Sequence, residues 1–129
     1  MKTSHIVAVI IVIVIIAALS FAALQTTGTV PGQYDDFAQC LTDNGAVFYG
    51  SFECPHCTTQ KNLFGNSMKF VNYVECGPLG GPIRQECRDA EITAYPTWII
   101  NGSQYLGTQE LTRLGELTNC SLTTNEQTS

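Results

Sequence analysis

The sequence predicts an α/β domain, a central mixed β-sheet flanked by helices, behind an N-terminal transmembrane helix. An uncharged apolar run extends from Ile6 to Leu24 near the start of the chain. After it, short β-prone runs alternate with segments whose apolar residues recur at helical spacing. Two β-prone segments then flank Asn101-Gly102, a strong signal for a two-residue hairpin because both turn positions need a positive φ.

The N-terminal run is nearly long enough to span the roughly 30 Å hydrocarbon core of a bilayer. We interpret residues 1–25 as a transmembrane anchor or, alternatively, a cleaved signal peptide, because Ser20-Phe21-Ala22 offers a small-x-small cleavage pattern. Lys2 precedes the run and no Lys or Arg follows before Lys61, which favours an inside N-terminus. We therefore expect the domain to lie on the extracytoplasmic side, membrane-anchored, or exported if the N-terminus is cleaved.

Residues 26–32 read as a linker, 33–121 as one domain and 122–129 as a polar tail. The chain has 11 Asp and Glu against six Lys and Arg, a net charge of −5. It shows no cluster of basic residues, which argues against nucleic acid as a partner.

The first half of the domain alternates helix and strand. The apolar residues Phe37, Ala38 and Leu41 recur at helical spacing, and Asn44-Gly45 ends that helix. In order, the expected elements are a helix at 34–43, a strand at 46–49, a helix that begins at the following cysteine motif and ends before Gly65, and a strand at 70–74.

The second half begins with a Gly/Pro loop at 77–82 and a short helix with Pro82 at its start. The hairpin strands at 96–100 and 103–106 follow. Thr108 can cap a last helix that carries Leu111, Leu114 and Leu117. Helices on both faces of a central sheet would bury every apolar stripe.

Cys54-Pro55-His56-Cys57 carries the predicted chemistry. A cysteine at a helix N-terminus has its thiolate stabilised by unpaired N–H groups and by the helix dipole, which assigns Cys54 as the nucleophile. Pro55 suits the first helical position. His56 is expected to stabilise the Cys54 thiolate further, as a hydrogen-bond donor or as a cation. Cys57 lies further into the helix, where it can resolve a mixed disulfide.

Tyr95-Pro96-Thr97 is the second predicted part of the site. A proline that opens a strand directly before a hairpin can form a cis peptide bond and place backbone beside the dithiol. Pro96 is then a catalytic candidate, with Tyr95 and Thr97 as substrate-binding candidates. The alternative is an ordinary trans proline at a strand start.

These motifs resemble those of known families. Cys54-Pro55-His56-Cys57 resembles the active-site tetrad of DsbA-type oxidases, and residues 95–98 resemble the cis-proline segment of the thioredoxin fold. Over about residues 36–120 the chain resembles the thioredoxin-like domain that accompanies bacterial and plant homologues of vitamin K epoxide reductase. The stretches that carry this resemblance are 48–50, 54–57, 60–65, 73–76 and 95–102.

The resemblance implies a thioredoxin fold and an extracytoplasmic thiol:disulfide oxidoreductase that oxidises cysteine pairs of protein substrates. It implies reoxidation of the Cys54/Cys57 disulfide by a quinone-linked membrane partner resembling vitamin K epoxide reductase or DsbB. We expect no cofactor and no metal. A reductase or isomerase remains the alternative, because these enzymes share a fold and differ in reduction potential.

Two positions depart from the families. An aromatic residue commonly precedes the first motif cysteine, whereas this chain has Glu53, whose carboxylate is expected either to oppose the thiolate or to point into water. Thioredoxin also carries a buried carboxylate in the strand before its motif, and Val47-Phe48-Tyr49 has none. Proton handling is therefore unassigned.

The other four cysteines favour pairing in an exported domain. The placement of Cys76 and Cys87 resembles a structural disulfide of the family, which leaves Cys40 and Cys120 either for a second bridge or for an electron relay. A four-thiolate zinc site is the rival from another class, and an oxidising compartment disfavours it. Its ligands would be Cys54, Cys57, Cys76 and Cys87.

Overall fold

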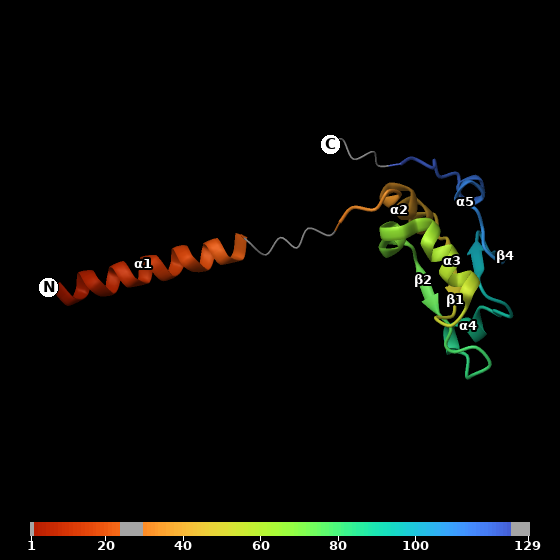
Figure 1. Cartoon of the computed structure of the whole chain (residues 1–129), viewed down its shortest axis with the longest axis horizontal. Helices are drawn as coiled ribbons and strands as arrows, with labels where there is room; N and C mark the ends of the chain where they lie inside the picture. Colours follow the sequence, from red (N-terminus) through yellow and green to blue (C-terminus); the bar gives the residue numbers. More distant parts are fainter. Residues whose placement is uncertain (1, 24–29, 125–129) are drawn as a thin grey trace.

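The computed structural model describes residues 2–23 and 30–124. Helix α1 spans Lys2–Ala23 and precedes the folded domain (Figure 1). Across these two described ranges, no helix is long and apolar enough to cross a membrane. Within the described residues the structure gives no support for the transmembrane anchor expected in residues 1–25, and residues 1, 24 and 25 of that segment lie outside the described ranges.

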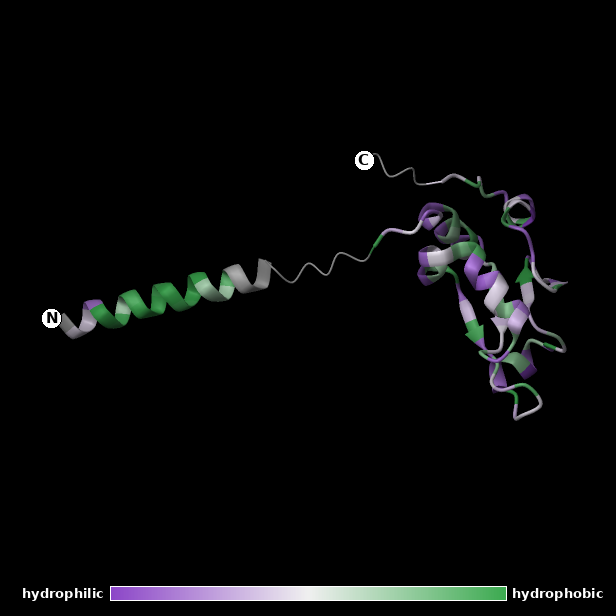
Figure 2. Ribbon diagram, in the orientation of Figure 1, coloured by the Kyte–Doolittle hydropathy of each residue, from purple (hydrophilic) through white to green (hydrophobic). Residues whose placement is uncertain are grey.

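The domain alternates helices and strands, which confirms the α/β class (Figure 1). In Figure 2 the helices of the domain carry both hydrophilic and hydrophobic residues, and α2 and α5 are amphipathic. Its elements are α2 (Asp35–Asp43), β1 (Val47–Gly50), α3 (Pro55–Phe64), the 3₁₀ helix η1 (Gly65–Phe70), β2 (Tyr73–Glu75), α4 (Gln85–Asp89), β3 (Thr97–Ile100), β4 (Ser103–Leu106) and α5 (Leu111–Thr118).

The four strands form one mixed sheet in the order β2-β1-β3-β4. Strand β1 pairs in parallel with β2 and antiparallel with β3, so Phe48 lies between Tyr73 and Trp98. The predicted hairpin is confirmed: β3 and β4 pair antiparallel across Asn101 (φ 51°) and Gly102 (φ 77°). This register places the end of β1, and the cysteine motif after it, at the middle of the sheet.

Three expected element starts were wrong. The last helix, expected to be capped by Thr108, begins at Leu111 with Glu110 at the N-cap position, and the Thr108 hydroxyl donates instead to the His56 carbonyl at 3.3 Å. The strand expected at 70–74 begins at Tyr73, because residues up to Phe70 continue α3 as η1. The helix expected to start at Pro82 begins at Gln85, and the residues between belong to the preceding loop.

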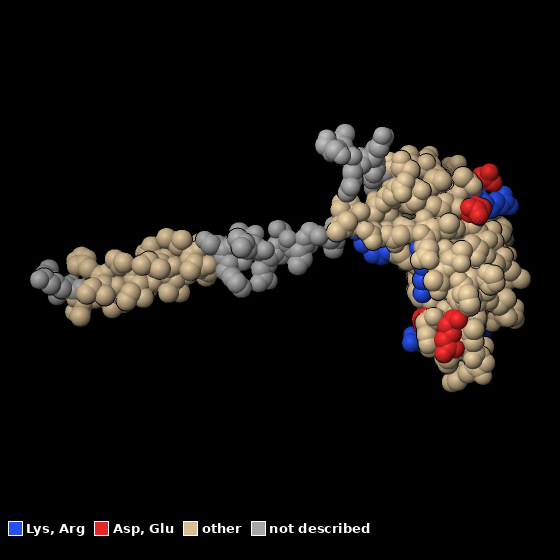
Figure 3. Space-filling view, in the orientation of Figure 1, with Lys and Arg blue, Asp and Glu red and all other residues tan. Residues whose placement is uncertain are grey.

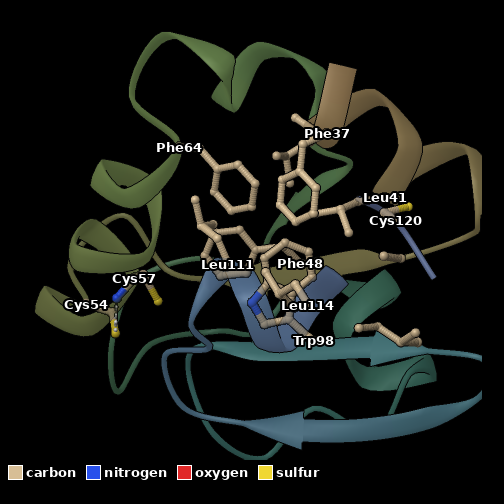
Figure 4. Close-up of a cluster of buried hydrophobic side chains, with 14 residues drawn as sticks. Phe37, Leu41, Phe48, Cys54, Cys57, Phe64, Trp98, Leu111, Leu114 and Cys120 are labelled. Carbon is tan, nitrogen blue, oxygen red and sulfur yellow. Dashed lines mark hydrogen bonds between the residues drawn. The ribbon is translucent and has the colours of Figure 1, made fainter. Parts of the chain in front are cut away.

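The main core joins the sheet to α2, α3 and α5 (Figure 4). The Phe48 and Trp98 rings stack at 5.0 Å, and the Phe64 ring lies 6.0 Å from that of Trp98. Burying aromatic side chains of this size stabilises a small domain strongly. A smaller cluster of Cys76, Cys87 and Ile92 packs at α4.

Candidate active site

Cys54 and Cys57 lie at the N-terminus of α3, directly after the central strand β1. Cys54 is the N-cap residue, with extended backbone (φ −82°, ψ 117°), and its Sγ accepts a hydrogen bond from the Cys57 backbone N at 3.3 Å (Figure 4). Pro55 occupies the first turn, where its missing N–H leaves no partner unsatisfied. Both thiols are free and buried. The helix terminus therefore faces the sulfur of Cys54, an arrangement that stabilises a thiolate.

The loop before β3 lies against Cys54. The Tyr95–Pro96 peptide bond is cis, and Cys54 Sγ lies 3.7 Å from the Tyr95 carbonyl oxygen, to which its thiol donates. The structure thus brings Tyr95 and Pro96 beside the dithiol. Thr97 is fully buried and its hydroxyl donates to the Ala94 carbonyl at 2.8 Å. Its predicted role in substrate binding therefore rests on its backbone.

His56 and Glu53 flank the motif on the surface. The His56 side chain is exposed, and its backbone carbonyl accepts from the Thr108 hydroxyl at 3.3 Å. The Glu53 Oε2 accepts from the Leu79 backbone N at 2.9 Å. The carboxylate of Glu53 therefore ties the Gly/Pro loop after β2 to the motif, a contact that neither sequence-based alternative included.

Cys57 is the more deeply buried thiol, with no exposed surface. Burial, together with the neighbouring Cys54 sulfur, raises the pKa of the Cys57 thiol to about 12, while a backbone hydrogen bond at Ser51 and, less strongly, the charge of Lys61 act in the opposite direction. Cys57 is thus a neutral thiol in the reduced protein at neutral pH. The structure thus places Cys54 at the helix start and Cys57 beneath it, an arrangement consistent with the predicted roles of nucleophile and resolving thiol.

Two residues that the sequence reasoning did not single out, Lys61 and Tyr73, lie near Cys57, and a third, Glu75, holds Tyr73. The Tyr73 hydroxyl donates to Glu75 Oε2, and Lys61 Nζ lies 3.8 Å from the centre of the Tyr73 ring. Burial and the Glu75 carboxylate raise the pKa of Tyr73. Burial would also raise the pKa of Glu75, but hydrogen bonds from Tyr73 and two backbone N–H groups hold it below its ordinary value. The sequence contained one signal, because Lys61 follows Cys57 by four residues and so shares its helix face.

Gln60 fixes the loop after β4 onto the active-site helix. Its buried Oε1 accepts from Trp98 Nε1 at 3.1 Å and from the Gln109 backbone N at 2.7 Å, and its Nε2 donates to the Gln109 carbonyl at 3.0 Å. The same loop carries Thr108, the partner of His56. A buried amide with its hydrogen bonds satisfied in this way locks the position of both segments.

The remaining cysteines are bonded in two pairs. Cys40 and Cys120 join α2 to the chain after α5 with an S–S distance of 2.06 Å, and Cys76–Cys87 closes the loop before α4. Figure 4 places Cys120 at the opposite end of the core from Cys54 and Cys57.

The zinc alternative is wrong, because Cys76 and Cys87 are bonded to each other and are therefore not available as thiolate ligands. Over the described part of the chain, no group of three or more His, Cys, Asp or Glu side chains could hold a metal ion. On the face drawn in Figure 3, acidic and basic side chains of the domain are scattered, with no continuous basic surface.

Comparison with known proteins gives an informative similarity. No model of a protein family matches the chain. The chain is 43% identical over 97 residues to the thiol-disulfide oxidoreductase LTO1 of Arabidopsis thaliana, a match that covers 71% of this chain and 26% of that protein. The chain thus spans about a quarter of the length of the curated relative. Its similarity is to part of a thiol-disulfide oxidoreductase, consistent with an oxidoreductase enzyme.

Proposed function

We propose that this chain is a thiol:disulfide oxidoreductase with a thioredoxin-type fold, and that it oxidises cysteine pairs of protein substrates through Cys54 and Cys57. One observation carries the proposal. Of six cysteines, the two left free lie at a helix N-terminus, and Cys54 lies against the carbonyl that precedes a cis-proline. The similarity to a thiol-disulfide oxidoreductase supports it.

The geometry supports each step of the proposed exchange. A substrate thiolate attacks Cys54 Sγ, the Cys54–Cys57 disulfide breaks, and Cys57 leaves as a thiolate that takes up a proton. A second substrate thiolate then attacks the substrate sulfur of the mixed disulfide, and Cys54 leaves as a thiolate facing the helix N-terminus. Two electrons pass to the cysteine pair and one substrate disulfide forms.

The backbone beside Cys54 suits an extended substrate. The Tyr95 carbonyl lies next to the sulfur that forms the mixed disulfide. A substrate chain that pairs with this backbone would gain main-chain hydrogen bonds without contributing a particular side chain. Broad acceptance of unfolded chains with cysteine pairs follows.

The proposal includes an extracytoplasmic location and a membrane redox partner of the quinone-linked kind. Two structural disulfides in a domain of this size support an oxidising compartment. In such a compartment, a quinone-linked partner that reoxidises the Cys54/Cys57 pair would complete the cycle.

Equilibration of the full chain with glutathione buffers tests the proposal. We expect one cysteine pair to titrate, with a reduction potential nearer to the about −120 mV of DsbA than to the about −270 mV of thioredoxin. A potential at the thioredoxin end would assign a reductase instead. Cys57→Ser should trap substrates as mixed disulfides, whereas Cys54→Ser should not, and equal trapping by both variants would refute the assignment of roles.

A further inference from the structure

Cys57 must carry a negative charge during exchange, and the site described above does not explain how it does so. In the proposed reaction its sulfur is a thiolate, as leaving group in one direction and as nucleophile in the other. The sulfur is fully buried, and burial disfavours the charged form of a thiol. Rapid exchange therefore requires a favourable charge near this sulfur.

Titratable side chains approach Cys57 from three parts of the fold. Cys54 lies at the start of α3, Lys61 lies one turn beyond Cys57 on the same helix, Tyr73 belongs to β2 and Tyr95 precedes β3. Of these four, Lys61 is the one that carries a positive charge. Its charge favours the Cys57 thiolate, in addition to the backbone hydrogen bond at Ser51.

Strand β1 leaves room for this arrangement because it ends in a glycine. A Cβ placed on Gly50 would lie 3.0 Å from Cys57 Sγ and 3.4 Å from the Tyr73 hydroxyl oxygen. The thiol and the tyrosine thus border the same point above the Gly50 backbone. Any side chain at position 50 would push into this space.

Lys61 is held in place by β2. Its ammonium lies over the Tyr73 ring at 3.8 Å, within the range of a cation–π interaction. The hydroxyl of that ring donates to Glu75, whose other carboxylate oxygen accepts from the backbone N of Gly77 at 2.9 Å and of Phe52 at 3.2 Å. The Tyr73 ring is therefore held by its strand at one end and by Glu75 at its hydroxyl, and the Lys61 side chain is half-buried.

We propose that Lys61, held over the Tyr73 ring, stabilises the thiolate that Cys57 becomes during disulfide exchange, and that Glu75 is a positioning residue that fixes Tyr73 for this purpose. The cluster replaces the buried carboxylate that this chain lacks before its motif. The inference rests on the proposed function, because it concerns a step of that reaction.

The step that Lys61 affects is the resolution of a mixed disulfide. The Cys57 thiol loses its proton to solvent, and its sulfur attacks Cys54 Sγ. The Cys54–Cys57 bond forms, the bond from Cys54 to the outer sulfur breaks, and the outer sulfur leaves with the electron pair as a thiolate. The charge on Cys57 before the attack is the one that Lys61 offsets. In the reverse direction the same charge appears on the leaving Cys57.

Reaction of the reduced full chain with an aromatic disulfide that releases a coloured thiolate separates the two steps. The first equivalent reports attack by Cys54, and the second reports resolution by Cys57. We expect Lys61→Met to slow the second phase about tenfold or more and to move its pH profile to higher pH by about one unit or more, since an opposite charge at close range shifts a pKa by roughly one to three units. The rate of the first phase should change little. Lys61→Arg keeps the positive charge and should therefore retain most of the rate of the second phase.

Lys69→Met is the matched control. Lys69 also lies over an aromatic ring, that of Phe70 at 5.0 Å, and it pairs with Asp35 at 3.7 Å. Losing this charge changes the net charge equally and should leave both phases unchanged. Tyr73→Phe keeps the ring but frees it from Glu75, and should slow the second phase less than Lys61→Met does.

An unchanged second phase and pH profile in folded Lys61→Met would overturn the inference while leaving the proposed function intact. If Lys61→Met does not fold, an unchanged pH profile in Tyr73→Phe would overturn it. Absence of a second phase in the unmodified chain would instead overturn the proposed function.

Discussion

Gln60 offers the most direct test of how the active-site helix is held, through the variant Gln60→Leu. The substitution keeps the side chain close to its original size but removes both the acceptor and the donor. The Trp98 indole N–H, which is fully buried, and the Gln109 backbone N–H then lose their partner. A buried donor left unpaired costs about 1 to 3 kcal/mol, and the lost bonds to the half-buried Gln109 add about 1 kcal/mol. We expect a loss of about 2 to 4 kcal/mol in the free energy of unfolding.

Urea unfolding of the oxidised full chain, followed by circular dichroism, measures this loss. Gln39→Leu is the control, because the exposed Gln39 bonds only Asp43 four residues away. That pair contributes about 0.5 kcal/mol or less. In a double-mutant cycle, adding Trp98→Phe to Gln60→Leu removes the unpaired donor, so the two substitutions should be less than additive by about 1 kcal/mol. A loss below about 1 kcal/mol in Gln60→Leu, or strict additivity, would refute the reasoning.

Four further predictions follow from the charges and disulfides of the domain. The pKa of Cys57 is raised from 9.0 to about 12 in the folded chain. The neutral thiol therefore stabilises the reduced protein fully at pH values below the pKa of the unfolded chain, and this stabilisation decreases as pH rises towards the pKa of the folded chain. Urea unfolding should therefore show reduced wild type losing about 1.4 kcal/mol more than reduced Cys57→Ser between pH 8 and pH 10. The pKa of Glu75 is lowered in the folded chain, so its carboxylate stabilises the fold at pH values above the unfolded pKa, and this stabilisation is lost as pH falls through the folded pKa. Glu75→Gln should therefore reduce the loss of unfolding free energy on the acid side of the pH–stability curve by about 1 kcal/mol or less. Replacing both Cys40 and Cys120, which close a loop with a sequence separation of 80, with serine should lower the free energy of unfolding by about 4.5 kcal/mol, and a calorimetric loss below about 2 kcal/mol would contradict the chain-entropy argument. Glu53→Gln should raise the reduction potential of the reactive pair by ~10 to 30 mV in glutathione equilibria, and no shift would leave its carboxylate with a structural role alone.

Local pattern predicted much of the architecture. The helical spacing of Phe37 and Leu41 indicated α2, and Asn101-Gly102 indicated the hairpin between β3 and β4. These signals are readable because a helix or a tight turn is specified by residues that are close in sequence. The same holds for Cys54, since a strand, a cysteine and a proline in succession place the sulfur at a helix start.

Element boundaries were less accurate where a segment could satisfy its backbone in more than one way. Residues 65–70 were not predicted as helical, but they continue α3 as a 3₁₀ helix that packs on α2. The Gly/Pro loop also extends to Arg84, whose N–H bonds the Cys76 carbonyl. The packing of residues 65–70 on α2 depends on neighbours about 30 positions away in the sequence.

Residues close together in the chain were enough to predict the candidate reactive pair, the hairpin and the alternation of helix and strand, because each depends on residues within about ten positions of one another. The tertiary structure alone decided which groups surround Cys57. Tyr73 meets Phe48 through the parallel register of β1 and β2, and that register brings Tyr73 over the glycine that ends β1 and beneath Lys61. A pattern of residue types does not specify which strands pair or in what register, since pairing is fixed by the packing of the whole core.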